Sequence, residues 1–224
     1  MRAASISPAS GLAALLACFM ALPAAAQDVD LLVTHTTVAA GADGIKRSTE
    51  FSERMVRRQN QVWLERVVPE GWHSETDHAH ADKAHKHLDV AVAARWITHD
   101  DAGKLRVRLA SQEDKVLVDV DKTDFANIDF DGSWLAAYYL IDPAALKAMK
   151  PAGKKGDLTT YLSADKARQL KVVWNDRLKV PVLVESISGA SSKRTVVEIR
   201  APAKTLPWQA TQPYTRKDYS DYLD

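Results

Sequence analysis

The chain has 224 residues, 46% of them hydrophobic, with 30 basic and 29 acidic side chains and a formal net charge of +1. A balanced charge gives no electrostatic basis for binding nucleic acid. The single cysteine, Cys18, excludes an internal disulfide framework and cysteine-ligated metal clusters. The length fits one domain, since β-rich domains reach about 200–250 residues.

The N-terminus has the three-part layout of a secretory signal. Arg2 precedes an apolar stretch over residues 11–22, and the small residues Ala24–Ala26 provide a cleavage site. The stretch is shorter than the ~20 residues that a membrane-spanning helix needs. We expect residues 1–26 to be a signal peptide, and residues 27–224 to be a single periplasmic domain with no transmembrane segment.

A lipid anchor is the alternative to cleavage. Leu15-Leu-Ala-Cys18 resembles a lipobox, which would place a lipid on Cys18 and tether the protein to a membrane. The chain stays apolar from Cys18 to Ala26, whereas lipoproteins turn polar at that point. The pattern therefore favours cleavage after Ala26.

The first half of the remaining chain carries strand patterns. Apolar and polar residues alternate, or β-branched residues gather, between turn-forming residues. Strands are predicted over 31–40, 48–57, 61–68, 89–98, 104–110 and 115–120. The second and third form a hairpin, and the last three form a meander.

The second half mixes helix and strand. Residues 134–141 are apolar and fit either state, while Asp142 and Pro143 favour a helix start before a helix over 144–150. A second helix is predicted near 163–170. Strands are expected over 168–174, 180–187 and 194–200. The pattern predicts a mainly β (α+β) fold of eight or nine strands, in which a curved antiparallel sheet or half-barrel carries one to three short helices.

Two strand pairs carry a family resemblance. The hairpin Phe51–Arg66 runs into Pro69, and Val173–Glu185, which contains Trp174, Asp176 and a Val-Pro-Val sequence, precedes Val196–Ile199. This arrangement resembles the periplasmic lipoprotein-carrier superfamily (LolA/LolB-like). The resemblance implies an open half-barrel whose concave apolar face is capped by helices and holds acyl chains.

The first functional prediction follows from this resemblance. It is a non-enzymatic periplasmic binding or carrier protein whose apolar cavity takes a lipid or lipoprotein. The tryptophans expected to line that cavity are Trp63, Trp96, Trp134 and Trp174. Packing in the core is the alternative role for these side chains. No nucleophile or acid–base pair stands out, so no catalytic residue is predicted and an enzyme is the less favoured class.

The second functional prediction is transition-metal binding. Six of the seven histidines fall between His73 and His99, and residues 72–89 form a His-rich loop or helix. The candidate ligands are His78, His80, Asp82, His85 and His87. Imidazole and carboxylate suit zinc or copper(II), and a helix or a strand would each bring at least two rings together. A periplasmic metal-handling protein would then be the partner. A polar loop and a pH-sensitive loop are the other interpretations.

Smaller motifs have ordinary interpretations. Residues 129–132 resemble the start of a calcium loop but lack its later ligands, so a turn is expected. Lysines between 147 and 155 fit a solvated helix end. His35 and His99 are expected at strand ends, and the tyrosine-containing tail after residue 214 is expected to be docked or frayed.

Overall fold

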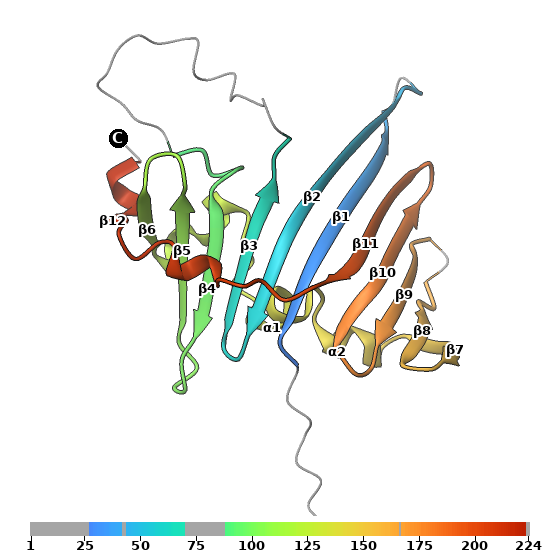
Figure 1. Cartoon of the computed structure of the whole chain (residues 1–224). Coiled ribbons are helices and arrows are strands. Elements are labelled where there is room, and N and C mark those ends of the chain that lie inside the picture. Colours follow the sequence, from blue (N-terminus) through green and yellow to red (C-terminus); the bar gives the residue numbers. More distant parts are fainter. Residues whose placement is uncertain (1–26, 42–43, 70–87, 166, 223–224) are drawn as a thin grey trace, which may run out of the picture.

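The computed structural model describes residues 27–41, 44–69, 88–165 and 167–222. These residues form one open, curved sheet of twelve strands with short helices (Figure 1). The predicted mainly β fold with a curved sheet is therefore confirmed. In the described part of the chain, no helix has the length and apolar character needed to cross a membrane.

The strands are β1 Val29–Ala40, β2 Lys46–Arg58, β3 Gln61–Val67, β4 Ala94–His99, β5 Leu105–Ser111, β6 Val116–Val120, β7 Lys150–Lys155, β8 Leu158–Leu162, β9 Gln169–Asn175, β10 Val180–Ser188, β11 Ser191–Arg200 and β12 Thr215–Asp218. The helices are η2 Lys122–Ile128, α1 Trp134–Tyr139, α2 Pro143–Lys147, η3 Pro207–Gln209 and η4 Tyr219–Tyr222.

The order across the sheet is β12-β6-β5-β4-β3-β2-β1-β11-β10-β9-β8-β7. Most neighbours are consecutive antiparallel strands joined by short turns. The exception at the centre is β1 against β11, with Asp30 opposite Arg200. This long-range pairing joins the first half of the chain to the second, so it decides which distant residues become neighbours.

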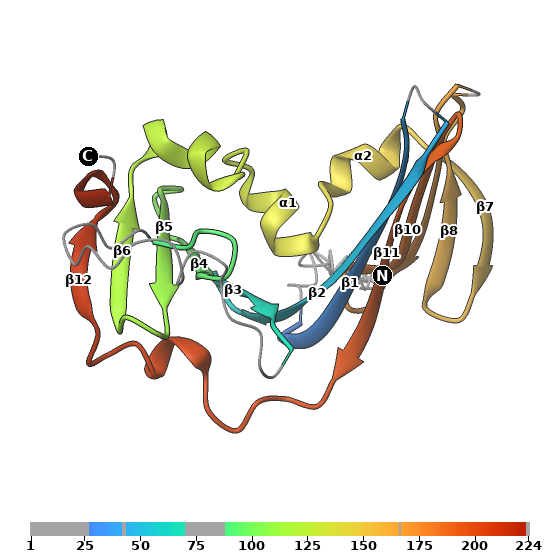
Figure 2. The same cartoon turned by 90° about the horizontal axis from the view of Figure 1, so that it is seen from above.

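The two faces of the sheet have different covers. Figure 2 shows η2, α1 and α2 inside the curve, on the concave face, and the residues after β11 passing along the convex face. We call residues 201–214 the C-terminal segment. It leads to β12, which pairs in parallel with β6, and to η4, where Tyr219 is buried. The tail is therefore docked.

Both α-helices begin at side-chain caps. The Ser133 hydroxyl accepts a hydrogen bond from the Ala136 amide at 3.1 Å, and the Asp142 carboxylate accepts one from the Ala144 amide at 2.8 Å. Such caps satisfy amides that have no partner inside the helix. The expected start at Asp142 and Pro143 is confirmed, and residues 134–139 are helical.

Several element predictions were wrong. No helix occurs at residues 163–165 or 167–170; β9 begins at Gln169. Lys150–Lys155 is an exposed edge strand instead of a helix end, because pairing with β8 overrides its Pro and Gly content. The expected strand over 89–98 begins only at Ala94. His99 does end a strand, whereas His35 lies in the middle of β1.

Candidate functional site

The four predicted tryptophans do not meet on one surface. Trp63 and Trp96 are opposite each other on β3 and β4 and belong to the cluster under the C-terminal segment, on the convex face. Trp134 is the first residue of α1, and Trp174 on β9 packs against Leu146 of α2, so both lie on the concave side. Neighbouring residues of a strand point to opposite faces, so Trp63 points away from Val62 and Leu64, which face the helices. Two of the four expected cavity residues, Trp63 and Trp96, therefore lie on the convex face.

Trp63 and Trp96 pack against other side chains on the convex face. Trp63 is 1% exposed, and Trp96 stacks on Trp208 of the C-terminal segment with 6.2 Å between ring centroids. The guanidinium of Arg108 lies 3.4 Å from the centre of the Trp96 ring. Burial lowers the pKa of Arg108 to about 10, with Arg106 adding to the effect. These contacts describe a sealed second core.

An aromatic row fills the concave face below the helices. Trp134 contacts Tyr138 at 4.8 Å between centroids, Tyr138 contacts Tyr139 at 5.0 Å, and Tyr139 contacts Trp174 at 6.5 Å. His99 stacks on Trp134 at 5.2 Å. The row joins the end of β4 to β9, so it spans the centre of the concave face.

A buried guanidinium holds α1 against the sheet. Arg57 is fully buried and donates hydrogen bonds to the carbonyls of Tyr138 at 3.0 Å and Leu178 at 2.6 Å, as well as to Gln27 and Lys179. Burial lowers the pKa of Arg57, an effect opposed by Tyr138 and Tyr139. Carbonyl oxygens take the place of water around this charge.

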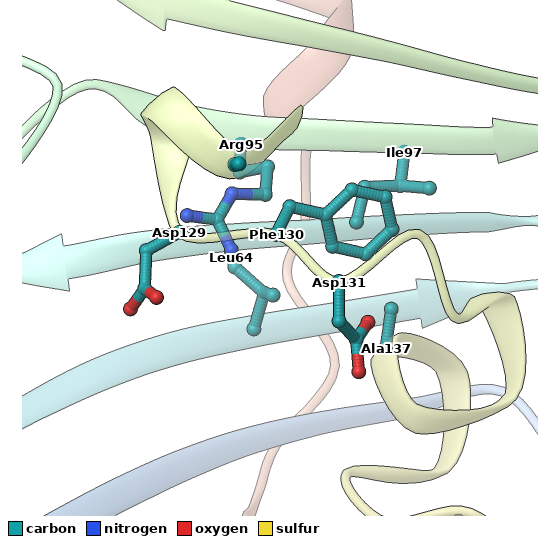
Figure 3. A pocket seen from close by; sticks show the side chains of 8 residues that line it. Leu64, Arg95, Ile97, Asp129, Phe130, Asp131 and Ala137 are labelled. Atoms are coloured by element: carbon teal, nitrogen blue, oxygen red, sulfur yellow. The ribbon is translucent and has the colours of Figure 1, made fainter. Parts of the chain in front are cut away.

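An open cavity of about 540 Å³ lies beside this row, between β3, β4 and the η2–α1 connection (Figure 3). Its lining residues are Leu64, Arg95, Ile97, Ala126, Asp129, Phe130, Asp131 and Ala137. Five of the eight are apolar. The volume falls in the range of small-molecule sites, ~300–1,000 Å³.

Arg95 is the basic residue among those lining the cavity. Its guanidinium donates to the Ile128 carbonyl at 2.5 Å and lies 5.9 Å from the Phe130 ring, while its Nε is buried without a hydrogen-bond partner. Burial lowers the pKa of Arg95, and Glu53 and Asp129 oppose this. Figure 3 shows the side chain beside Asp129 and Phe130. A cavity that combines five apolar residues with one basic and two acidic side chains suits an amphipathic ligand.

Sequence reasoning missed Arg95 and Phe130 as cavity residues. The turn over residues 129–132 is confirmed: Asp129 ends η2 in a left-handed conformation, and Asp131 accepts a hydrogen bond from the Ser133 amide at 2.8 Å. The only sequence signal was this turn between two apolar stretches. A turn indicates that two elements are connected, but it does not indicate which strands the connection crosses.

The predicted metal ligands His78, His80, Asp82, His85 and His87 lie outside the described residues. Across the described ranges, no group of three His, Cys, Asp or Glu side chains is arranged to hold a metal ion. Metal binding by residues 72–89 stays a prediction.

Comparisons with known proteins give structural likenesses only. No family model and no curated protein matches the chain. Among solved structures, a LolA superfamily protein from Nitrosomonas europaea is similar with 9% identity and a TM-score of 0.36, over 83% of this chain and 90% of that one. PNGF-II is similar with 12% identity and a TM-score of 0.36, over 87% of this chain. This chain spans about a third of PNGF-II, 32% of its length.

Proposed function

We propose that the protein is a periplasmic binding or carrier protein that holds the acyl chain of a lipid or lipoprotein on its concave face. The observation that carries the proposal is the open cavity of about 540 Å³ against β3 and β4. Leu64, Ile97 and Phe130 line it; Leu64 is half-buried, whereas Ile97 and Phe130 are buried and form its apolar wall. Apolar surface left accessible in a concave site gains free energy when an apolar ligand covers it.

The polar residues at the cavity suit the head of an amphipathic ligand. Arg95 is half-buried at the cavity wall, and Asp129 and Asp131 are exposed at the rim. A ligand with an acyl chain and a polar head would match this division. Helix α1 borders the cavity at Ala137, which lies three residues after Trp134 of the aromatic row and therefore next to it on the helix surface.

The test is titration of the mature protein with long-chain fatty acids, followed by tryptophan fluorescence and calorimetry. Ala126 lines the cavity and is exposed, so Ala126→Trp should fill the space and weaken binding at least about tenfold while the fold persists. Leu135→Trp is the matched control, because Leu135 is 43% exposed on α1 and does not line the cavity. Equal affinity of both variants and the parent protein would contradict this site.

A second function is proposed for the His-rich segment. Residues 72–89 supply four histidines in two His-x-His pairs, which is the observation that favours binding of zinc or copper(II). The two functions involve different parts of the chain and are tested separately.

A further inference from the structure

Three side chains on adjacent strands form a hydroxyl–imidazole–carboxylate array. They are Thr195 on β11, His35 on β1 and Glu53 on β2. Nδ1 of His35 lies 3.0 Å from the Thr195 hydroxyl oxygen, and Nε2 of His35 lies 3.3 Å from a Glu53 carboxylate oxygen. Thr195 and His35 are 160 positions apart in the sequence. The pairing of β1 with β11 makes them direct neighbours.

The array lies on the concave face. His35 is two residues beyond Val33 on β1, and Thr195 is two residues before Val197 on β11, so all four side chains point to the same side of the sheet. Val33 and Val197 belong to the core beneath α1. The array therefore lies next to that core, two residues further along each strand. The side chains of His35 and Glu53 are 29% and 31% exposed, which leaves them accessible to a ligand.

Glu53 lies at ion-pair distance from Nε2 of His35, on the side of the ring away from Thr195. In the tautomer that carries its proton on Nε2, Nδ1 is the atom that accepts the hydroxyl proton of Thr195. A nucleophile within reach of a base, with a third group orienting that base, is the arrangement of covalent acyl-transfer sites.

We propose that this array hydrolyses carboxylic esters, with Thr195 as nucleophile, His35 as general base and Glu53 as the positioning residue. Oγ1 of Thr195 attacks the ester carbonyl carbon as its proton passes to Nδ1 of His35. The bond from the carbonyl carbon to the alcohol oxygen breaks, and His35 returns the proton to that oxygen. Water then attacks the acyl-threonine with His35 again taking a proton, which releases the acid and restores the hydroxyl.

The surroundings favour an apolar acyl group. Val184 on β10 is directly opposite Thr195, and it packs with Val172 and Leu170 in the cluster beneath α2. On the other side, Phe51 contacts the His35 ring at 4.9 Å between centroids. Arg66 covers Phe51, with its guanidinium 4.0 Å from the ring centre. This substrate class rests on the proposed function, in which the concave face holds an acyl chain.

The experiment uses the mature protein with p-nitrophenyl esters of two to twelve carbons. We expect hydrolysis above the buffer rate that increases with chain length. Thr195→Ala and His35→Gln should each lower the rate at least about 100-fold, as loss of a nucleophile or a general base does. Thr195→Ser should retain activity. Glu53→Gln should lower kcat about tenfold with KM unchanged.

A matched control lies on the opposite face of the same strand. Thr36 donates a hydrogen bond to Glu50 at 3.0 Å on the convex face, so Thr36→Ala removes a comparable threonine–glutamate contact and should leave the rate unchanged. Peptide mass mapping after reaction with a fluorophosphonate should locate the label on Thr195. Hydrolysis no faster than buffer for every ester, or full activity in Thr195→Ala, would overturn the inference.

Fatty-acid binding measured on the same preparations separates this inference from the proposed function. Binding without ester hydrolysis would overturn the esterase alone. Hydrolysis of short esters without binding of long-chain acids would support the array and contradict the carrier function.

Discussion

Trp96 on β4 lies nearly parallel to Trp208 of the C-terminal segment, with 13° between the ring planes. The contact joins residues more than one hundred positions apart and holds the C-terminal segment on the convex face. Leu206 and Tyr214 pack against the same cluster. The segment thus covers this cluster on the convex side of the sheet.

Replacing Trp208 with Ala should release the C-terminal segment. The variant loses a stacked pair, worth about 0.5–1.5 kcal/mol, together with buried apolar area, so the free energy of unfolding should fall by about 2 kcal/mol. Urea unfolding measures the loss, and limited proteolysis should show new cuts between residues 201 and 214. The free energy of unfolding of Trp208→Phe should lie between those of the wild-type protein and Trp208→Ala. An unchanged cleavage pattern in Trp208→Ala would show that the stack does not hold the segment.

Replacing Arg57 with Met should destabilise the domain strongly. Four backbone carbonyls lose a charged donor in a buried site, so we expect the free energy of unfolding to fall by about 3 kcal/mol or more. Arg54→Met is the control on the same strand, because the Arg54 side chain is 41% exposed and its loss should cost less than about 0.5 kcal/mol. Equal effects in urea unfolding would contradict the role given to the buried guanidinium.

Replacing Arg108 with Met should leave stability unchanged or raise it by about 1 kcal/mol. Arg108 is 7% exposed and its Nε has no partner, and buried charges of this kind can be exchanged for apolar groups without loss. Arg106→Met, which removes an exposed pair with Asp119, is the control and should change stability by less than about 1 kcal/mol. A loss of several kcal/mol in Arg108→Met would mean that the stacking on Trp96 outweighs the burial of charge.

The pH dependence of Arg108 follows from the direction of its shift. Its pKa falls to about 10 in the folded protein, well below the ordinary value of an arginine, so above pH 10 the unfolded chain binds more protons and stability rises with pH. Below pH 10 Arg108 is protonated in both the folded and the unfolded protein, so the free-energy cost of burying its charge does not change with pH. The difference between the wild-type protein and Arg108→Met should therefore be flat from pH 6 to 9, as urea unfolding at several pH values would measure. A difference that changes steadily across that range would contradict it.

The His-rich segment predicts near-stoichiometric zinc or copper(II) in untagged mature protein purified from the periplasm. A variant with His78, His80, His85 and His87 changed to Ala should lose the metal. Elemental analysis by mass spectrometry measures both proteins, and His35→Ala is a control outside the segment. Absence of metal from the wild-type protein would contradict the metal-binding function.

Local patterns in the sequence were enough to predict the β-rich fold, the β2–β3 hairpin and the start of α2. These features depend on alternation, turn residues and a capping side chain, all within a few positions of one another. The predicted roles of Trp63 and Trp134 show where local information ends. Both faces of β3 are apolar, since Val62 and Leu64 alternate with Trp63. Alternation therefore separates the two faces but does not say which one the helices cover.

The tertiary structure alone decided the long-range neighbours. His35 and Thr195 meet because β1 pairs with β11 in one register, and a shift of one residue would place them on opposite faces. The cavity likewise depends on where the η2–α1 connection crosses β3 and β4. Register between distant strands is set by the packing of the whole sheet against its helices and the C-terminal segment, which no short stretch of the sequence encodes.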